Sequence, residues 1–452
     1  MAQTLLSVLS HNQAMKVITL LTLFMTSTAL AQSLDQMIDR EIPSLVATYK
    51  QLHAAPELSM QEKNTSALVA ARLRELGYEV SYPVGQYLEP GATCYGIVAI
   101  MKNGAGPTVL VRTDMDALPV SEQTGLPYAS TVRAKSMAGD DVPVMHACGH
   151  DIHMTTLMGT AKMLAQLKSQ WHGTVMLIGQ PAEEVVKGAD GMLRDHLYER
   201  FPKPDFAIAL HDTPQLPAGT IGYTPGFAMA NSDTVDITVY GRGGHGSAPQ
   251  NTIDPIVIAA RMVLAFQTIV ARENDPRDPA VVTVGTIHGG TRSNIIPDEV
   301  RLQLTVRSYK AEVRRKLLAA IERIAKAEAL AAGAPKEPLV KIDLGYDATY
   351  NDPALTKRVA TALASAFGAS HVVEAPPVMG SEDFGDFGRA AKCPSLMFWL
   401  GGSEPGKFAA AQGDMTKLPS LHSSEWAPDR EPTLKTGATA LTVAALELLG
   451  KP

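Results

Sequence analysis

The sequence predicts an α/β fold in which a main domain with a largely parallel sheet is interrupted by an inserted βαββαβ unit. Three observations lead to this expectation. Short apolar runs alternate with helical patterns from about Pro107 onward, apolar and polar residues alternate between Asn231 and Tyr346, and a further apolar run begins at Pro394. Wholly apolar runs are typical of parallel strands covered on both faces, whereas alternation is typical of a sheet with one covered face.

The expected main domain consists of helices that cover a buried sheet. It starts with a helix from Gln36 onward and closes with a helix over Thr433–Leu449, which Gly450 terminates. Between them we expect, in order, a strand at 108–114 (TVLVRTD), a helix at 152–168, strands at 174–180 (TVMLIGQ) and 205–211 (DFAIALH), and a last strand at 394–400. This alternation of strand and helix is the rhythm of βαβ units.

The expected insertion is of ferredoxin-like type. Its strands are placed at 233–241, 280–289, 299–309 and 338–345, with helices from Pro255 and over Ala311–Ala332. Asp254 before Pro255 and Gly333 after Ala332 are typical helix boundaries. The predicted division of the chain is therefore 32–228 and 345–452 for the two parts of the main domain and 229–344 for the insertion.

Composition and charge narrow the possible functions. The chain has 452 residues, of which 45% are hydrophobic, so it can bury two cores. Its net charge is −6, with both signs mixed along the chain. No basic stretch alternates with aromatic residues, so a nucleic-acid partner is not expected. A small molecule or a peptide fits this composition better.

A secretory signal peptide is expected over residues 1–31. Met15 and Lys16 precede the apolar run Val17–Met25, and the Ala29-Leu30-Ala31 stretch resembles a cleavage site. The run is short for a membrane span, and we expect no later stretch that is long and apolar enough for one. The prediction is a secreted or periplasmic protein without a membrane segment in its mature form. A cytoplasmic protein with a frayed N-terminus is the alternative.

The segment MHACGHDIHM (145–154) concentrates metal-binding side chains in a chain with 3 cysteines and 12 histidines. Three cysteines cannot form a disulfide framework, and Cys148 is expected to bind metal. In open α/β sheets, ligands collect beyond the carboxyl ends of the strands. The polar residues that follow the expected strands are Asp114, Asp116, Glu183, Glu184, His211 and, after the last strand, His422.

These residues include more strong donors than one metal ion needs. A tetrahedral zinc takes four ligands, and a catalytic one usually takes three from the protein. The five donors Cys148, His150, Glu184, His211 and His422 therefore indicate two neighbouring divalent ions that share a water. Of two adjacent glutamates, one would coordinate and the other would act as general base. His146 and His153 are expected to form hydrogen bonds around the site. Each of these residues alone could have a purely structural role, but their occurrence together favours a metal-binding site.

With these residues in place, the sequence resembles the metal-dependent aminoacylase and carboxypeptidase family, particularly its hippurate hydrolase and auxin-conjugate amidohydrolase branch. The resemblance covers nearly the whole chain after residue 31 and implies a catalytic domain with an inserted lid and dimerisation domain. Members hydrolyse an amide bond whose amine side is usually an amino acid with a free carboxylate. The matching stretches are RTDMDALP, HACGHDIHM, QPAEE, ALHD, GRGGHGSAP, GGTRSNIIPDEV and GSEDF.

The resemblance also implies a role for individual residues. The five donors would be the metal ligands, Glu183 the base, and Asp116 a residue behind the site. Related branches have a histidine ligand where this chain has Asp114, so which donor bridges the ions stays open. His245 would reach the active site of the partner in a homodimer and stabilise the oxyanion, although its loop could be only a glycine-rich turn. Substrate contacts would come from Asn294, Gly380 and Arg307, the last as a bidentate partner for a carboxylate or as part of a solvated strand face.

The sequence thus predicts a two-metal amidohydrolase that cleaves hippurate-like N-acyl amino acids or dipeptides. One alternative is a metallocarboxypeptidase that acts on longer peptides, and another is an inactive relative that binds metal or peptide. Two divalent ions are expected as cofactors, zinc or manganese in the first place and cobalt or nickel as alternatives.

Overall fold

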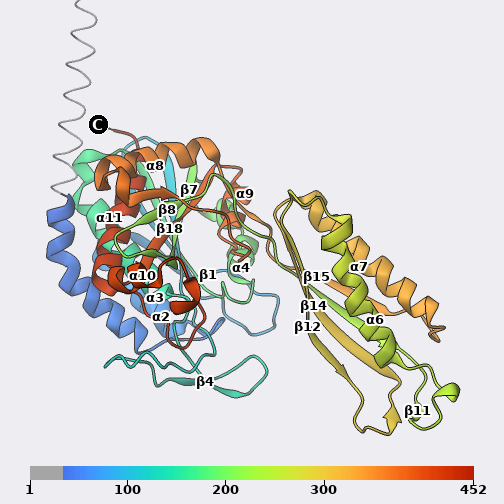
Figure 1. Cartoon of the computed structure of the whole chain (residues 1–452). Coiled ribbons are helices and arrows are strands. Elements are labelled where there is room, and N and C mark those ends of the chain that lie inside the picture. Colours follow the sequence, from blue (N-terminus) through green and yellow to red (C-terminus); the bar gives the residue numbers. More distant parts are fainter. Residues whose placement is uncertain (1–33, 452) are drawn as a thin grey trace, which may run out of the picture. The chain divides into compact units, whose positions relative to one another are not determined.

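The computed structural model describes residues 34–451, so the predicted signal segment at 1–31 lies outside the described residues. The chain divides into two compact units (Figure 1). Of the described residues, unit 1 comprises 34–225, Asn351–Ala375 and 387–451, and unit 2 comprises Gly226–Tyr350 and Pro376–Asp386. The predicted fold class is confirmed, because a mixed α/β unit with a mostly parallel centre is interrupted by a unit with an antiparallel sheet.

Unit 1 is built on an eight-stranded sheet. Its order is β1-β2-β6-β3-β7-β18-β8-β17, and the four central strands β6, β3, β7 and β18 run parallel. Their residues are buried almost throughout, as apolar runs in a sheet covered on both faces should be. The strands are β1 (Glu79–Val84), β2 (Gly96–Asn103), β3 (Thr108–Asp114), β6 (Gly173–Gln180), β7 (Phe206–Pro217), β8 (Ile221–Tyr223), β17 (Val372–Glu374) and β18 (Ser395–Ser403).

The helices of unit 1 share one large core with this sheet. A helix over 34–53 contributes Ile38 and Tyr49 to it, and α3 packs directly against α11. α3 is buried on nearly every side, which matches its apolar sequence. The other helices are α2 (Lys63–Glu75), α3 (His150–Gln166), α4 (Gly188–Arg194), α5 (Leu197–Arg200), α8 (Pro353–Phe367), α9 (Gly385–Ala391), α10 (Pro405–Ala411) and α11 (Arg430–Leu448).

Some elements of unit 1 differ from the sequence prediction. The strands β1, β2, β8 and β17 were not predicted, and three of the pairings at the margins of the sheet are antiparallel. α3 begins at His150 rather than at Ile152, because the left-handed Gly149 turns the chain directly into the helix. β7 continues to Pro217, so His211 lies inside this strand and not beyond its end.

Unit 2 contains the predicted βαββαβ order. Its sheet has the order β12-β14-β10-β15, and every pairing is antiparallel. Buried and exposed residues alternate along β10 and β14, and the buried set packs on α6 and α7. The Asp254 side chain caps α6 by accepting from Ile256 N–H at 2.8 Å. The elements are β10 (Asp233–Tyr240), α6 (Pro255–Thr268), β12 (Ala280–Gly289), β14 (Glu299–Ser308), α7 (Ala311–Ala331) and β15 (Leu339–Leu344).

Three pairs of short strands lie outside the two large sheets. β11 (Gly244–His245) pairs with β13 (Ile295–Ile296), and β4 (Arg133–Lys135) pairs with β5 (Asp141–Pro143). β9 (Gly226–Met229) pairs with β16 (Thr349–Asn351), and these two strands lie where the chain leaves and re-enters unit 1.

One helical stretch among residues 34–451, Pro255–Glu273, is long and apolar enough to cross a membrane by length and composition alone. The expectation that no later stretch would meet these criteria was therefore wrong. Ile258, Met262 and Phe266 from this stretch are buried in the core of unit 2, so the apolar composition is used there for packing.

Candidate metal centre

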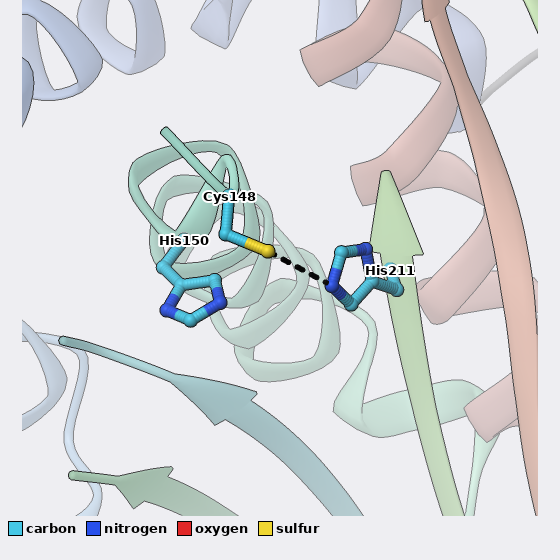
Figure 2. Close-up of side chains that lie close together, drawn as sticks. All are labelled: Cys148, His150 and His211. Atoms are coloured by element: carbon cyan, nitrogen blue, oxygen red, sulfur yellow. Dashed lines mark hydrogen bonds between the residues drawn. The ribbon is translucent and has the colours of Figure 1, made fainter. Parts of the chain in front are cut away.

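Three of the predicted ligands converge where α3 begins beside β7. Figure 2 shows Cys148 and His150 at the start of α3 and His211 projecting from β7 toward the sulfur. The Cys148 Sγ atom lies 3.6 Å from His211 Nε2. Gly149 makes this approach possible, since it has φ +76° and a Cβ atom there would lie 2.3 Å from an Asp212 carboxylate oxygen. The backbone turn at Gly149 thus places two donors, Cys148 and His150, beside the third.

Backbone carbonyl groups fix the orientation of both histidine rings. His150 Nδ1 donates to the Asp116 carbonyl at 2.8 Å, and His211 Nδ1 donates to the Asp212 carbonyl at 2.7 Å. With Nδ1 of each ring bound to a backbone carbonyl, Nε2 is the ring nitrogen left to face the cluster. This arrangement is the usual support for a metal-binding histidine.

The other two predicted ligands come from loops. Glu184 Oε1 lies 3.4 Å from His422 Nε2 and 3.9 Å from His150 Nε2. His422 Nε2 is also 3.2 Å from Cys148 Sγ. His422 has φ +65°, and its N–H donates to the Ala147 carbonyl at 2.8 Å. Its side chain is 54% exposed, which makes this the side of the cluster open to solvent and to a substrate.

Two atoms of this cluster lack a hydrogen-bond partner although they are buried. Among the described residues, His150 Nε2 and Glu184 Oε1 are both in this condition. An unsatisfied buried polar atom costs about 1–3 kcal/mol, so two such atoms facing each other call for a ligand. Thiol, imidazole and carboxylate donors within 4.8 Å of one another form the groups Cys148-His150-His211, Cys148-Glu184-His422 and His150-Glu183-Glu184. The donor set therefore fits divalent cations.

The electrostatics of the cluster also favour a cation. Burial raises the pKa of the Cys148 thiol well above its usual value, and the carboxylates of Glu184 and Glu183 add to this effect. Burial alone would lower the pKa of His150, but Asp114 and Asp116 outweigh it and raise that pKa to about 10. Without metal, the site therefore holds protons. A divalent ion supplies the missing positive charge and displaces them.

Glu183 lies beside the cluster, in the loop between β6 and α4. The residue is 6% exposed, and its carboxylate lies close to both His150 and Glu184. The Asp116 carboxylate accepts the N–H groups of Glu183 at 3.1 Å and Glu184 at 3.0 Å. Asp116 thus supports the backbone of both glutamates from behind.

A second layer of charged residues lies behind the ligands. Asp114 accepts from Arg112 Nη1 at 2.8 Å and from His153 Nδ1 at 2.7 Å. Burial alone would raise the pKa of Asp114, but His150, His153 and Arg112 outweigh it and hold that pKa well below its usual value. Asp114 is therefore a carboxylate in the resting protein.

The two remaining histidines of the motif differ from each other. His153 forms hydrogen bonds with carboxylates at both ring nitrogens, to Asp114 at 2.7 Å and to Asp212 at 3.1 Å, as expected. The expectation for His146 was wrong, because both of its ring nitrogens are buried without a hydrogen-bond partner in the described part of the chain. Burial lowers the pKa of His146 to about 4, so this ring is neutral.

The four predicted residues of unit 2 fall into two groups. His245 and Asn294 lie on neighbouring loops, where Gly246 N–H donates to the Asn294 carbonyl at 2.8 Å. Arg307 Nη1 donates to the Met379 carbonyl at 2.9 Å, next to Gly380. His245 and Asn294 lie near the start of β14 and Arg307 near its end, and the eight residues from Val300 to Arg307 span roughly 24 Å. One copy of unit 2 therefore does not bring all four residues together.

Sequence reasoning missed several residues that support the cluster. Asp212 receives Trp426 Nε1–H at 3.2 Å and contacts His153, and Arg112 joins Asp114 to Gln180. Asp212 follows His211 directly in ALHD, and Arg112 precedes Asp114 in RTD, so both lie inside the motifs that carry the predicted donors. The link from Trp426 to Asp212 spans 214 residues and has no local signal.

Comparison with known proteins places this geometry among metallohydrolases. The sequence matches peptidase family M20/M25/M40 over residues 110–415. It is 38% identical to thermostable carboxypeptidase 1 of Saccharolobus solfataricus over 91% of this chain and 97% of that one. It is also 38% identical to hippurate hydrolase of Campylobacter jejuni over 76% and 84% of the two chains. A crystal structure of a dinuclear metal-binding M20 peptidase from Bacillus subtilis superposes with a TM-score of 0.72 at 29% identity, covering 91% of this chain and 99% of that one.

Proposed function

The chain belongs to peptidase family M20/M25/M40, and from this premise we propose that it is a two-metal amidohydrolase that cleaves N-acyl amino acids or dipeptides. The observation that carries the proposal is the pair of buried, unpartnered atoms His150 Nε2 and Glu184 Oε1, 3.9 Å apart and surrounded by three further donors. A binding protein without catalysis would not need a further buried carboxylate, Glu183, beside them.

The side chains around the cluster divide the work of hydrolysis. Cys148, His150, Glu184, His211 and His422 would hold two divalent ions, and such ions would polarise the amide carbonyl and make the attacking water more acidic. Glu183 would accept the proton of the attacking water and deliver it to the leaving amine nitrogen. His245 from a second copy of the chain would donate a hydrogen bond to the oxyanion. The Arg307 guanidinium would bind the free carboxylate of the substrate.

The chemistry of the donor set favours some metals over others. One thiolate and three imidazoles suit zinc, and the carboxylate is also compatible with manganese. We propose zinc or manganese as the native pair. Metal analysis of protein purified without added metal tests this choice, and a preparation that carries only cobalt or nickel would contradict it.

A second candidate function, carboxypeptidase action on longer peptides, is favoured by the 38% identity to thermostable carboxypeptidase 1. Both functions use the same cluster and a free carboxylate on the substrate. A panel of N-acetyl and N-benzoyl amino acids, dipeptides and longer peptides on metal-loaded protein separates them by the ratio of kcat/KM values. Release of a C-terminal residue from the longer peptides in preference to N-acyl amino acids would support the carboxypeptidase.

The proposed roles of the adjacent glutamates are separable by isosteric substitution. Glu183→Gln keeps size and hydrogen bonding but cannot accept a proton, so kcat should fall by roughly two to four orders of magnitude with metal content unchanged. Glu184→Gln should lose metal together with activity, and excess metal should restore part of both. Metal analysis and steady-state kinetics of both variants show which glutamate is the base and which is the ligand. A Glu183→Gln protein without metal, or a Glu184→Gln protein that holds both ions, would reverse the assignment.

We also propose that the enzyme is exported and that the mature chain begins near Gln32. The support is the apolar run at Val17–Met25 followed by Ala29-Leu30-Ala31. N-terminal sequencing of the active protein recovered from the producing cells checks this. Active enzyme that retains Met1 or Met15 would contradict export by cleavage.

A further inference from the structure

The loop that carries Glu183 and Glu184 has an unfavourable backbone conformation. It runs from Gln180 at the end of β6 to Gly188 at the start of α4. Ala182 has φ +51° and Val186 has φ +61°. A left-handed conformation costs an L-residue about 1–2 kcal/mol, and a β-branched residue is rarely found in it. Such a loop keeps its shape only if the surrounding structure holds it.

Two buried carboxyl groups hold this loop through three consecutive backbone N–H groups. Ala182 N–H donates to Glu62 Oε1 at 2.8 Å. The next two N–H groups, of Glu183 and Glu184, donate to Asp116 at 3.1 and 3.0 Å. Successive N–H groups that point toward one side form a typical anion-binding turn. Here that turn is filled by side chains of the protein itself, so Glu62 and Asp116 define where the two glutamates project.

The position of Glu62 in its own helix does not explain its side chain. Glu62 is the N-cap residue of α2, yet its side chain makes no capping hydrogen bond to that helix. Residues at this position ordinarily accept from the first turn of their own helix. Glu62 Oε1 accepts instead from Met60 N–H and Ala182 N–H, each at 2.8 Å, and the side chain is fully buried. The contact with Ala182 spans 120 residues.

The other oxygen of Glu62 makes the burial of this carboxyl group costly. Glu62 Oε2 is buried without a hydrogen-bond partner among the described residues. Burial and the neighbouring Asp116 carboxylate raise the pKa of Glu62 to about 8, so glutamine is a close mimic of this side chain at neutral pH. An apolar residue would avoid the cost of burying the group, but it would leave the Ala182 N–H without an acceptor.

We infer that Glu62 is a positioning residue that fixes the backbone from which the general base and its neighbouring metal ligand project. The inference rests on the proposed roles of Glu183 and Glu184. Glu62 touches neither the reacting atoms nor the ligands, and it acts only through the Ala182 N–H group.

The chain offers a matched control for this inference in Glu57. This glutamate belongs to the same segment and also accepts two backbone N–H groups, from Asn64 at 3.1 Å and Thr65 at 2.7 Å. Both donors lie in the first turn of α2, so Glu57 supports the helix and not the loop. Glu57→Leu therefore removes two comparable backbone hydrogen bonds, and a third from Asn64 Nδ2 at 2.7 Å, without touching the backbone of Ala182.

The test compares Glu62→Leu, Glu62→Gln and Glu57→Leu by kinetics and by hydrogen exchange of the peptide covering 180–188 in metal-free protein. In Glu62→Leu we expect kcat to fall about 10- to 100-fold, with KM within about threefold, because misplacement of a catalytic group by about 1 Å is enough for such a loss. The amides at 182–184 should exchange at least about tenfold faster. Glu62→Gln should stay within about threefold of wild type, and Glu57→Leu should lower Tm while kcat is kept.

Several results would overturn the inference. Unchanged exchange at 182–184 or unchanged kcat in Glu62→Leu would do so, and so would a Glu62→Gln protein that resembles Glu62→Leu. If Glu62→Leu does not fold, Glu62→Ala takes its place, because water can enter the space it leaves. An inactive wild-type enzyme would refute the proposed function instead, while the exchange comparison would still decide whether Glu62 holds the loop.

Discussion

At the scale of single residues, His53 is a charged group that the catalytic proposal does not use. Its ring bridges two carboxylates, with Nδ1 2.7 Å from Asp151 Oδ2 and Nε2 3.0 Å from Glu122 Oε1. Burial alone would lower the pKa of His53, but these two hydrogen bonds outweigh it and raise the pKa to about 10. Asp151 lies in the first turn of α3, so the bridge ties the helix that carries His150 to two distant segments.

This bridge predicts a pH-dependent contribution to stability. The pKa of His53 is raised from about 6.5 in the unfolded chain to about 10 in the folded one. The stabilisation by charged His53 is therefore fully present below about pH 6.5 and is lost as the pH rises through about 10. His53→Gln should lower the unfolding free energy by about 1–3 kcal/mol at pH 6.5 and by clearly less at pH 10.5.

Denaturant titrations of wild type and His53→Gln at both pH values measure this difference. The exposed His172, directly before β6, supplies the control, since His172→Gln should have a similar small effect at both pH values. An unfolding free-energy difference for His53→Gln that does not change with pH would show that His53 is neutral in the folded protein.

At the scale of elements, the entry into α3 organises the metal centre. Gly149 precedes the helix in a left-handed conformation, and a Cβ atom at this position would lie 2.3–2.5 Å from the Asp212 carboxyl group. No rearrangement of a long flexible side chain relieves this contact, because Asp212 is buried and joined to His153 and Trp426. The spacing Cys-Gly-His is thus a steric requirement at the junction of α3 and β7.

Gly149→Ala should therefore weaken metal binding as well as stability. The left-handed φ costs about 1–2 kcal/mol, and the contact with Asp212 displaces Cys148 and His150, so metal affinity should fall at least about tenfold. Gly139 provides the control, because it has φ +90° but nothing within 4 Å of a Cβ atom. Gly139→Ala should lose only the stability that the left-handed φ costs, and it should bind metal normally. Thermal unfolding measures the first effect and chelator competition the second. Equal metal affinity in the two variants would contradict this account.

At the scale of the whole molecule, unit 2 carries apolar surface that its own core does not use. Val257 and Leu264 on α6 are 56% and 73% exposed, and Ile287 on the edge strand β12 is 51% exposed. A long edge strand with apolar side chains is a surface that proteins usually cover. His245 and Arg307 also lie at opposite ends of β14, which is consistent with a substrate contacted by two copies of the chain.

We therefore expect a homodimer that pairs through α6 and β12. The double variant Leu264→Lys with Ile287→Lys should sediment as a monomer and lose activity, because two buried charges without partners oppose the interface and His245 of a second copy is no longer available. Leu330→Lys, at an 82% exposed position on α7, should remain dimeric and active. Analytical ultracentrifugation checks both variants. A monomeric wild type that is fully active at micromolar concentration would contradict the expectation.

Local patterns in the sequence were sufficient for the main elements and for the selection of donors. The apolar run at 108–114 and the alternation at 233–241 each report the burial of their own strand, and Cys148, His150 and Glu184 have side-chain chemistry that identifies them wherever they lie. The marginal strands were missed because β8 and β17 have three residues each, too few for a periodic pattern. Short strands depend on their neighbours rather than on their own sequence.

Only the tertiary structure decided which atoms of these residues face one another. The free Nε2 of His150 follows from a hydrogen bond to the Asp116 carbonyl 34 residues away, and the support of Ala182 by Glu62 joins segments 120 residues apart. His53 and Asp151 are 98 residues apart. Sequence determines the chemistry and the local conformation of each segment because both depend on nearby residues. The lone pairs left for metal, and the carboxyl groups that hold a strained loop, depend on which distant segments meet in the folded core.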